Sequence, residues 1–201
     1  RRAIGREDVS LLTSDHPIVT GAVDLLLGSE QGNCTFGIWP DENDKTILIE
    51  AMFVLEALAP AHLHADRFLP PTPLSILVNH KKEQLKLDLP GLEKGAPYKL
   101  LDNPKIGREI IPAMLEATQA FAEKEALDII AEASSAMESQ LQSEIDRLTS
   151  LREVNDHVRP EEIELAREQL AQLTDVISRA RVRLDTLRLI WKGSPEAITG
   201  A

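Results

Sequence analysis

The stretch HLHAD brings three potential metal ligands together. His62, His64 and Asp66 alternate along it, so on a β-strand all three side chains would point to one side. Imidazole nitrogens and carboxylate oxygens are zinc ligands, and this spacing therefore raises the hypothesis of a metal site. The alternative is a polar strand face or connector. We favour that alternative, because so short a two-histidine match arises often by chance, and we predict no metal site.

Other side chains capable of acid–base chemistry are scattered along the sequence. His16 precedes Pro17 at the start of a predicted helix, where local packing or capping explains it better than a catalytic base. Asp24, Glu50 and Glu56 stand among apolar neighbours, but no spacing selects a pair that could divide acid and base roles. We expect these carboxylates to face solvent, and we predict no catalytic residue.

The sequence contains no recognisable phosphate-binding loop. GSEQGN has two glycines but lacks the lysine and the following helix of a P-loop, and Gly-x-Gly-x-x-Gly does not occur. The single cysteine, Cys34, excludes an intrachain disulfide, and we expect a small apolar strand residue there rather than a reactive thiol. These 201 residues are therefore predicted to bind no cofactor and no small-molecule substrate.

The bulk composition describes an acidic globular protein. The chain has 33 acidic and 22 basic side chains, a net charge of −11, which opposes binding of nucleic acid by the whole surface. No apolar run approaches the roughly 20 residues that span a bilayer, and the lone cysteine fits a reducing cytoplasm. Because the chain begins Arg1-Arg2 rather than with Met, we expect a piece of a longer protein.

Residues 1–100 carry most of the strand signals. A helix is predicted over 17–27, where Ser14 or Asp15 can cap and Gly28 can stop it. Apolar runs bounded by breaker-rich turns predict strands over 34–39, 46–58, 74–78 and 85–89. The run 46–58 is too apolar for clean alternation, so both of its faces are expected to be partly covered.

A proline-rich joint separates two of these strands in RFLPPTP. Pro70, Pro71 and Pro73 fix φ near −65° and have no amide donor, which enforces a stiff, extended path. PPTP also has the Pro-x-x-Pro spacing of a ligand peptide, but it lies between two apolar strands rather than in a disordered tail. We therefore predict a structural corner formed by Arg67, Phe68 and the three prolines.

Residues 101–192 are predicted to form a long helical hairpin, followed by a flexible tail over 193–201. Pro112 should break the first helix near Ile110 or Ile111, and the next 42 or so residues lack Gly and Pro, enough for a helix of roughly 60 Å. A second helix should run from Pro160 to about Lys192. Its heptad spacing predicts an antiparallel hairpin, with pairing between chains as the alternative, and a seam of Ile163, Leu170, Leu173, Ile177, Leu184 and Leu187.

A cluster of arginines lies near the end of this predicted helix. It consists of Arg179, Arg181, Arg183 and Arg188. These cations could contact phosphates, but cations also favour the C-terminal end of a helix. We favour this second interpretation, with salt bridges from Arg167, Arg179 and Arg183 to the acidic first helix.

Together these elements predict an α+β fold, an antiparallel sheet with a short helix followed by the long antiparallel helical hairpin. Several stretches in this order resemble the C-terminal region of the RapA (HepA) family. The segments DHPIV and DLLLGSEQGN are similar to that family's first helix and turn, VLEALAP and RFLPPTP to its strand–corner–strand segment, and RLTSLREVN and RVRLDTLRLI to its final hairpin. The resemblance runs from about residue 7 to residue 190.

The resemblance implies a longer parent, a bacterial RNA polymerase-associated ATPase of the Swi/Snf helicase-like class. Its two motor lobes would precede this region, bind ATP with Mg and contact double-stranded DNA, and the parent would promote recycling of core RNA polymerase in the cytoplasm. No motor motif maps onto these residues. The chain is thus expected to be a non-catalytic accessory domain, whose partners are the core polymerase and its own motor lobes. A stand-alone interaction module using the hairpin is the alternative.

Overall fold

The computed structural model describes residues 13, 16–28, 33–89, 91–155 and 157–198. The chain divides into two compact units, Arg1–Cys34 and Thr35–Ala201. The first contains the predicted helix, α1 (Pro17–Gly28). Nδ1 of His16 accepts a hydrogen bond from the N–H of Ile18 at 3.2 Å, so His16 caps this helix locally. The predicted caps Ser14 and Asp15 lie outside the described residues, as does the side chain of Asp24.

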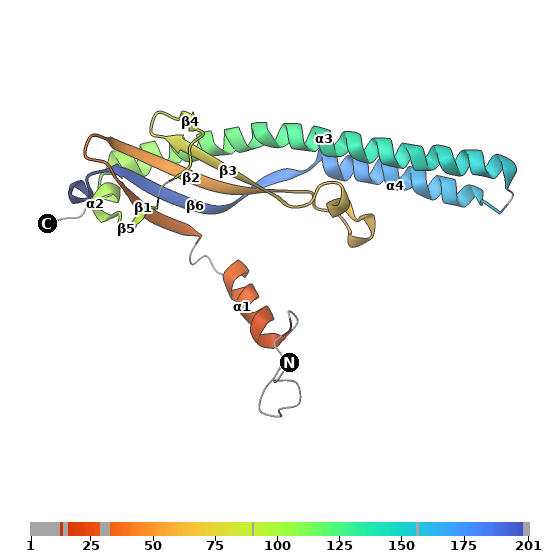
Figure 1. The fold of residues 1–201 in the computed structure, drawn as a ribbon, viewed down its shortest axis with the longest axis horizontal. Coiled ribbons are helices and arrows are strands. Elements are labelled where there is room, and N and C mark those ends of the chain that lie inside the picture. Colours follow the sequence, from red (N-terminus) through yellow and green to blue (C-terminus); the bar gives the residue numbers. More distant parts are fainter. Residues whose placement is uncertain (1–12, 14–15, 29–32, 90, 156, 199–201) are drawn as a thin grey trace, which may run out of the picture. The chain divides into compact units, whose positions relative to one another are not determined.

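The second unit is built around a six-stranded sheet with the order β4-β3-β2-β6-β1-β5 (Figure 1). The strands are β1 (Cys34–Pro40), β2 (Lys45–Glu56), β3 (Thr72–Asn79), β4 (Gln84–Leu85), β5 (Glu93–Lys94) and β6 (Arg181–Gly193). The apolar runs at 34–39, 46–58 and 74–78 therefore form strands as predicted. The run 85–89 does not, because only Leu85 pairs in β4 and Leu87 is exposed.

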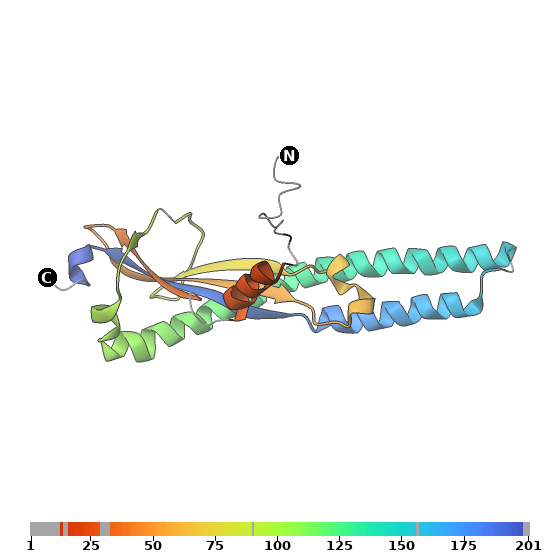
Figure 2. The same ribbon diagram turned by 90° about the horizontal axis from the view of Figure 1, so that it is seen from below.

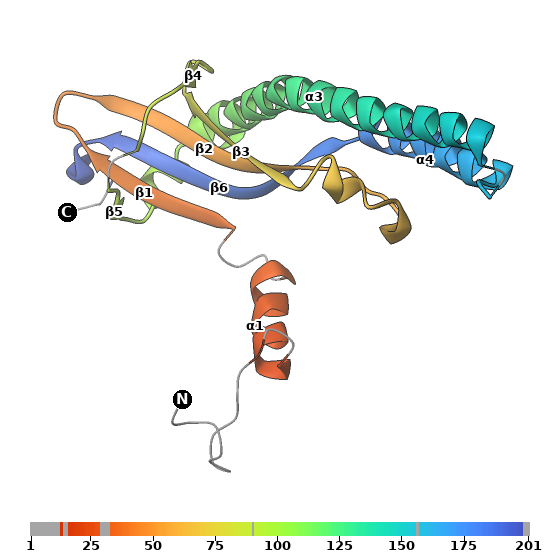
Figure 3. The same ribbon diagram turned by 45° about the vertical axis from the view of Figure 1, so that its right-hand side comes forward.

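The predicted antiparallel sheet is wrong, because the sheet is mixed. Strand β6 pairs antiparallel with β2 along its length, from Arg181 opposite Glu56 to Gly193 opposite Lys45. It also lies between β2 and β1. Since only the short turn 41–44 joins β1 to β2, these two strands run in opposite directions, and β1 is therefore parallel to β6 (Figure 3). The last strand of the chain thus separates the first two.

The helical hairpin predicted over 101–192 is correct only in its first part. Helix α4 ends at Ser178, and the chain then becomes β6. In RVRLDTLRLIW the apolar residues fit the steps of three and four of a helix, but they also fit the alternation of a strand. Pairing with β2 favours the strand. Leu184 and Leu187, predicted in the helical seam, therefore lie on a strand. Beyond it, Pro195–Ala197 form a 3₁₀ turn and Ile198 is buried.

The long first helix is confirmed. α3 (Ile111–Val154) has 44 residues and follows a short helix α2 (Tyr98–Leu101) and a π-helical turn (Ile106–Ile110). The change from π to α geometry falls at Ile110 and Ile111, where Pro112 predicted a break. No described helix is both long and apolar enough to cross a membrane.

The first part of α3 covers one face of the sheet (Figure 2). Along β2 the alternate residues Ile47, Ile49, Ala51, Phe53 and Leu55 are buried in the main core, which they share with Met114 and Ala122 of α3. The opposite face holds a smaller cluster of Leu48, Leu77 and Ile190, against which Trp39, Leu85, Leu89 and Leu92 pack. Both faces of β2 are thus partly covered, as its continuous apolar sequence predicted.

The second part of α3 packs against α4 (Pro160–Ser178) and forms a two-helix arm that extends past the sheet (Figures 1 and 2). Four predicted seam residues lie in α4. Ile163, Leu173 and Ile177 are buried, and Leu170 is half-buried. On α3, Met137, Leu141 and Ile145 are also buried, and Met137 and Leu141 belong to the same core cluster as Leu173 and Ile177. Small side chains such as Ala133 allow the helices to approach.

Candidate functional site

The proline corner is the connection between β2 and β3. It contains two 3₁₀ turns, Ala61–Leu63 and Ala65–Arg67, before Pro70 and Pro71, and Pro73 already pairs with Val54 within the sheet. Leu63, Ala65 and Leu69 are buried in the main core, and Phe68 packs against it. The guanidinium carbon of Arg67 lies 5.3 Å from the centroid of the Phe68 ring. The corner is therefore anchored by its apolar side chains.

The three candidate metal ligands lie in this corner, but not on a strand. His62 belongs to the first 3₁₀ turn, Asp66 belongs to the second, and all three side chains are exposed. His64 joins the two turns with a left-handed backbone, φ 47° and ψ 45°. In the described part of the chain, no group of three His, Cys, Asp or Glu residues is placed to hold a metal. The strand geometry on which the metal hypothesis depended is thus wrong.

A groove separates the corner from α4. It is lined by His62, Leu63, Leu165, Glu168, Gln169 and Gln172, and has a volume of about 310 Å³. Two of its lining side chains, Leu63 and Leu165, are apolar, and the remaining lining side chains are polar. We call this feature the corner groove. No local sequence pattern indicates this groove, because its two walls lie about a hundred positions apart.

The arginines at 181–188 lie on β6, on a strand rather than at a helix end. Arg188 Nη1 is 3.2 Å from Glu50 Oε2, and Arg183 Nε is 3.5 Å from Glu56 Oε1. Glu50 and Glu56 are on β2, on the sheet face opposite α3. The predicted salt bridges to the first helix are therefore wrong. Arg179 at the end of α4 does follow the prediction for a helix C-terminus, with Asp175 Oδ1 2.7 Å from its Nη2.

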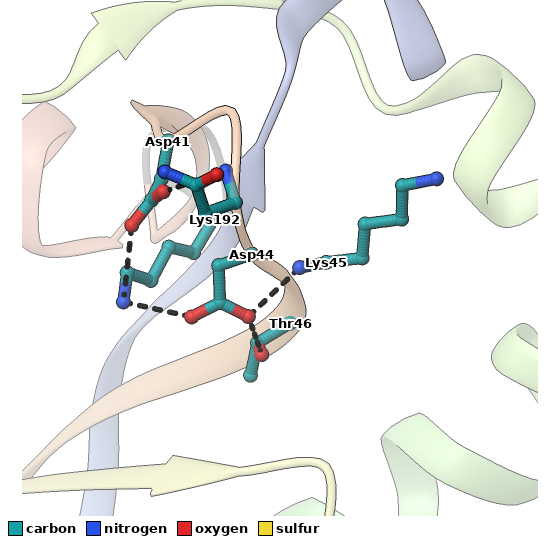
Figure 4. A network of polar contacts seen from close by, with 6 residues as sticks. Asp41, Asp44, Lys45, Thr46 and Lys192 are labelled. Carbon is teal, nitrogen blue, oxygen red and sulfur yellow. Dashed lines mark hydrogen bonds and ion pairs between the residues drawn. The ribbon is translucent and has the colours of Figure 1, made fainter.

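A polar cluster fastens the end of β6 to the turn between β1 and β2 (Figure 4). Lys192 Nζ lies 2.7 Å from Asp44 Oδ2, 3.4 Å from Asp41 Oδ2 and 4.8 Å from the centroid of the Trp39 ring. Asp44 also accepts hydrogen bonds from Thr46 Oγ1 and from the N–H of Lys45. We call these contacts the strand-end clasp. The sequence indicated the turn but nothing that linked it to Lys192.

The clasp changes the proton affinity of its members. Hydrogen bonds from Lys192 and then Thr46 lower the pKa of Asp44 from 3.8 to about 2. The hydrogen bond to Asp44 in turn raises the pKa of Lys192. Both changes stabilise the charged forms, so the clasp is an ion pair at neutral pH. Its members contact one another, and we interpret this cluster as structural.

Comparison with known proteins identifies the family. Residues 1–192 match the family described as "RNA polymerase recycling family C-terminal". The chain belongs to this family. The resemblance seen in the sequence motifs is thereby confirmed.

Relatives of this chain include several proteins named RNA polymerase-associated protein RapA. Those of Haemophilus influenzae (strain PittEE) and Photobacterium profundum are each 33% identical over 199 residues, which cover 94% of this chain and 21% and 20% of the relative. That of Pectobacterium carotovorum is 30% identical over 200 residues, with coverage of 94% and 20%. The chain spans about a fifth of the length of these relatives.

Proposed function

We propose that this chain is the C-terminal accessory region of an RNA polymerase-associated ATPase that promotes polymerase recycling. In this proposal the chain itself is non-catalytic. ATP and Mg bind to motor lobes elsewhere in the parent, and DNA is contacted through those lobes. The partners of this region are the core RNA polymerase and the motor lobes, in the bacterial cytoplasm and at the nucleoid.

The family match over residues 1–192 is the observation that carries this proposal. The architecture supports it, because a sheet braced by α3 holds a two-helix arm whose outer surface remains exposed. Among the described residues, Arg183 and Arg188 of β6 form ion pairs with glutamates of β2, and the carboxylates of the clasp form ion pairs with Lys192.

The test compares the parent protein, the parent without residues 1–201, and this chain alone. We expect the parent to hydrolyse ATP and to bind core RNA polymerase, and the chain alone to show no ATP hydrolysis. Deletion should weaken polymerase binding at least tenfold, which corresponds to about 1.4 kcal/mol of lost interaction. ATP turnover by the chain alone, or unchanged polymerase binding after the deletion, would contradict the proposal.

A further inference from the structure

The negative charge of the chain is concentrated in the segment that forms α3, α4 and the turn between them. Residues 111–178 contain 15 acidic and 5 basic side chains, a net charge of −10 out of −11 for the whole chain. The remaining residues are thus nearly neutral. A surface of this kind attracts positively charged partners and repels both nucleic acid and a second copy of itself.

An exposed leucine interrupts this acidic surface at the corner groove. Leu165 is 66% exposed and lines the groove together with Leu63. Along α4, Glu161 lies four positions before Leu165 and Glu168 three positions after it, so both carboxylates share its face of the helix. A partner surface that complements this one would carry an apolar side chain flanked by cations.

The two carboxylates beside Leu165 are free to receive an outside cation. Arg167 Nη1 lies 2.6 Å from Glu164 Oε1, and Arg179 is paired with Asp175. Neither Glu161 nor Glu168 has a cation within salt-bridge distance among the described residues. The groove therefore combines an unpaired carboxylate, that of Glu168, with the apolar side chains of Leu63 and Leu165.

We propose that the corner groove is the docking site for a segment of a partner protein that presents an apolar side chain next to Lys or Arg. The apolar side chain would lie on Leu63 and Leu165, and the cation would pair with Glu168. The choice of partner rests on the proposed function, and this partner is a basic segment on the surface of core RNA polymerase. The proline corner then has a second role, because it supplies one wall of the groove.

The test measures the affinity of the full-length parent for core RNA polymerase, with Leu165→Ala or Glu168→Lys in this region. Each substitution should weaken binding about tenfold, as expected when an interface anchor is truncated or a charge is reversed. Added salt should weaken the unaltered protein more than the Glu168→Lys variant. Because both side chains are exposed, thermal unfolding should be unchanged.

Matched controls lie on α3. Leu127 is 65% exposed and Glu132 is exposed, so Leu127→Ala and Glu132→Lys make the same chemical changes away from the groove. Controls that bind like the unaltered protein would support the groove. Equal weakening by Glu132→Lys, or full affinity of both groove variants, would overturn it. If the unaltered parent fails to bind polymerase, the proposed function itself is wrong, and the partner named here with it.

Discussion

Replacing Lys192 by methionine tests the strand-end clasp with little change of side-chain volume. The side chain of Lys192 is 24% exposed and contacts Asp41 and Asp44, whose side chains are 30% and 33% exposed. Ion pairs this exposed contribute less than about 1 kcal/mol each because water screens them. The contact with Trp39 adds about 0.5–1 kcal/mol. We therefore expect Lys192→Met to lower the free energy of unfolding by about 1–2 kcal/mol at pH 7.

The stabilisation by Asp44 should decrease as the pH falls. The folded-state pKa of Asp44 is about 2, below its ordinary 3.8, so its stabilisation is present above pH 3.8 and is lost as the pH falls toward 2. In Lys192→Met the largest cause of the low pKa is gone. The difference in unfolding free energy between the two proteins should therefore shrink between about pH 4 and pH 2.

Urea unfolding followed by tryptophan fluorescence provides the assay, because Trp39 and Trp191, the two tryptophans of the chain, both lie at this end of the sheet. The matched control is Lys45→Met. Lys45 bonds Asp44 through its backbone N–H, and its side chain points away from the carboxylate in Figure 4. A difference that stays constant from pH 7 to pH 2, or an equal loss in the control, would show that the ion pair between Lys192 and Asp44 does not stabilise the fold.

Two further substitutions test the fold itself. Leu173 is completely buried in the arm, so Leu173→Ala should lower the free energy of unfolding by about 2–5 kcal/mol. The helical circular dichroism signal should then be lost at a lower urea concentration than in the unaltered protein. Thr174→Ala, at the exposed neighbouring position, should leave that concentration unchanged. A Cβ on Gly193 would lie 2.8 Å from the carbonyl oxygen of Asp44, so Gly193→Ala should lower stability by about 1–3 kcal/mol. Melting temperatures equal to that of the unaltered protein would contradict the packing at either site.

Local sequence signals were sufficient for the elements near them in the chain. The absence of Gly and Pro after Pro112 predicted α3, and Pro160 with its following glutamates marked the start of α4. The strands β1, β2 and β3 were bounded by breaker-rich turns. In each case residues close in sequence determine the backbone, so composition and spacing carry the information.

The errors arose where distant segments decide the structure. The residues of β6 fit both a heptad and an alternating pattern. They form a strand because they pair with β2, between β2 and β1. Mixed strand directions follow from that same insertion. The clasp joins residues about 150 positions apart, and the corner groove joins β2–β3 to α4, so no local pattern could indicate either one.

The proposed role of this chain depends on its binding to core RNA polymerase, which can be measured directly. The labelled chain would be titrated with core polymerase, and fluorescence anisotropy would report the complex. We predict a saturable, salt-sensitive rise that unlabelled chain competes away, with no ATP hydrolysed in the same samples. No anisotropy change at any accessible polymerase concentration, or ATP consumption by the purified chain, would contradict a region that acts by binding alone.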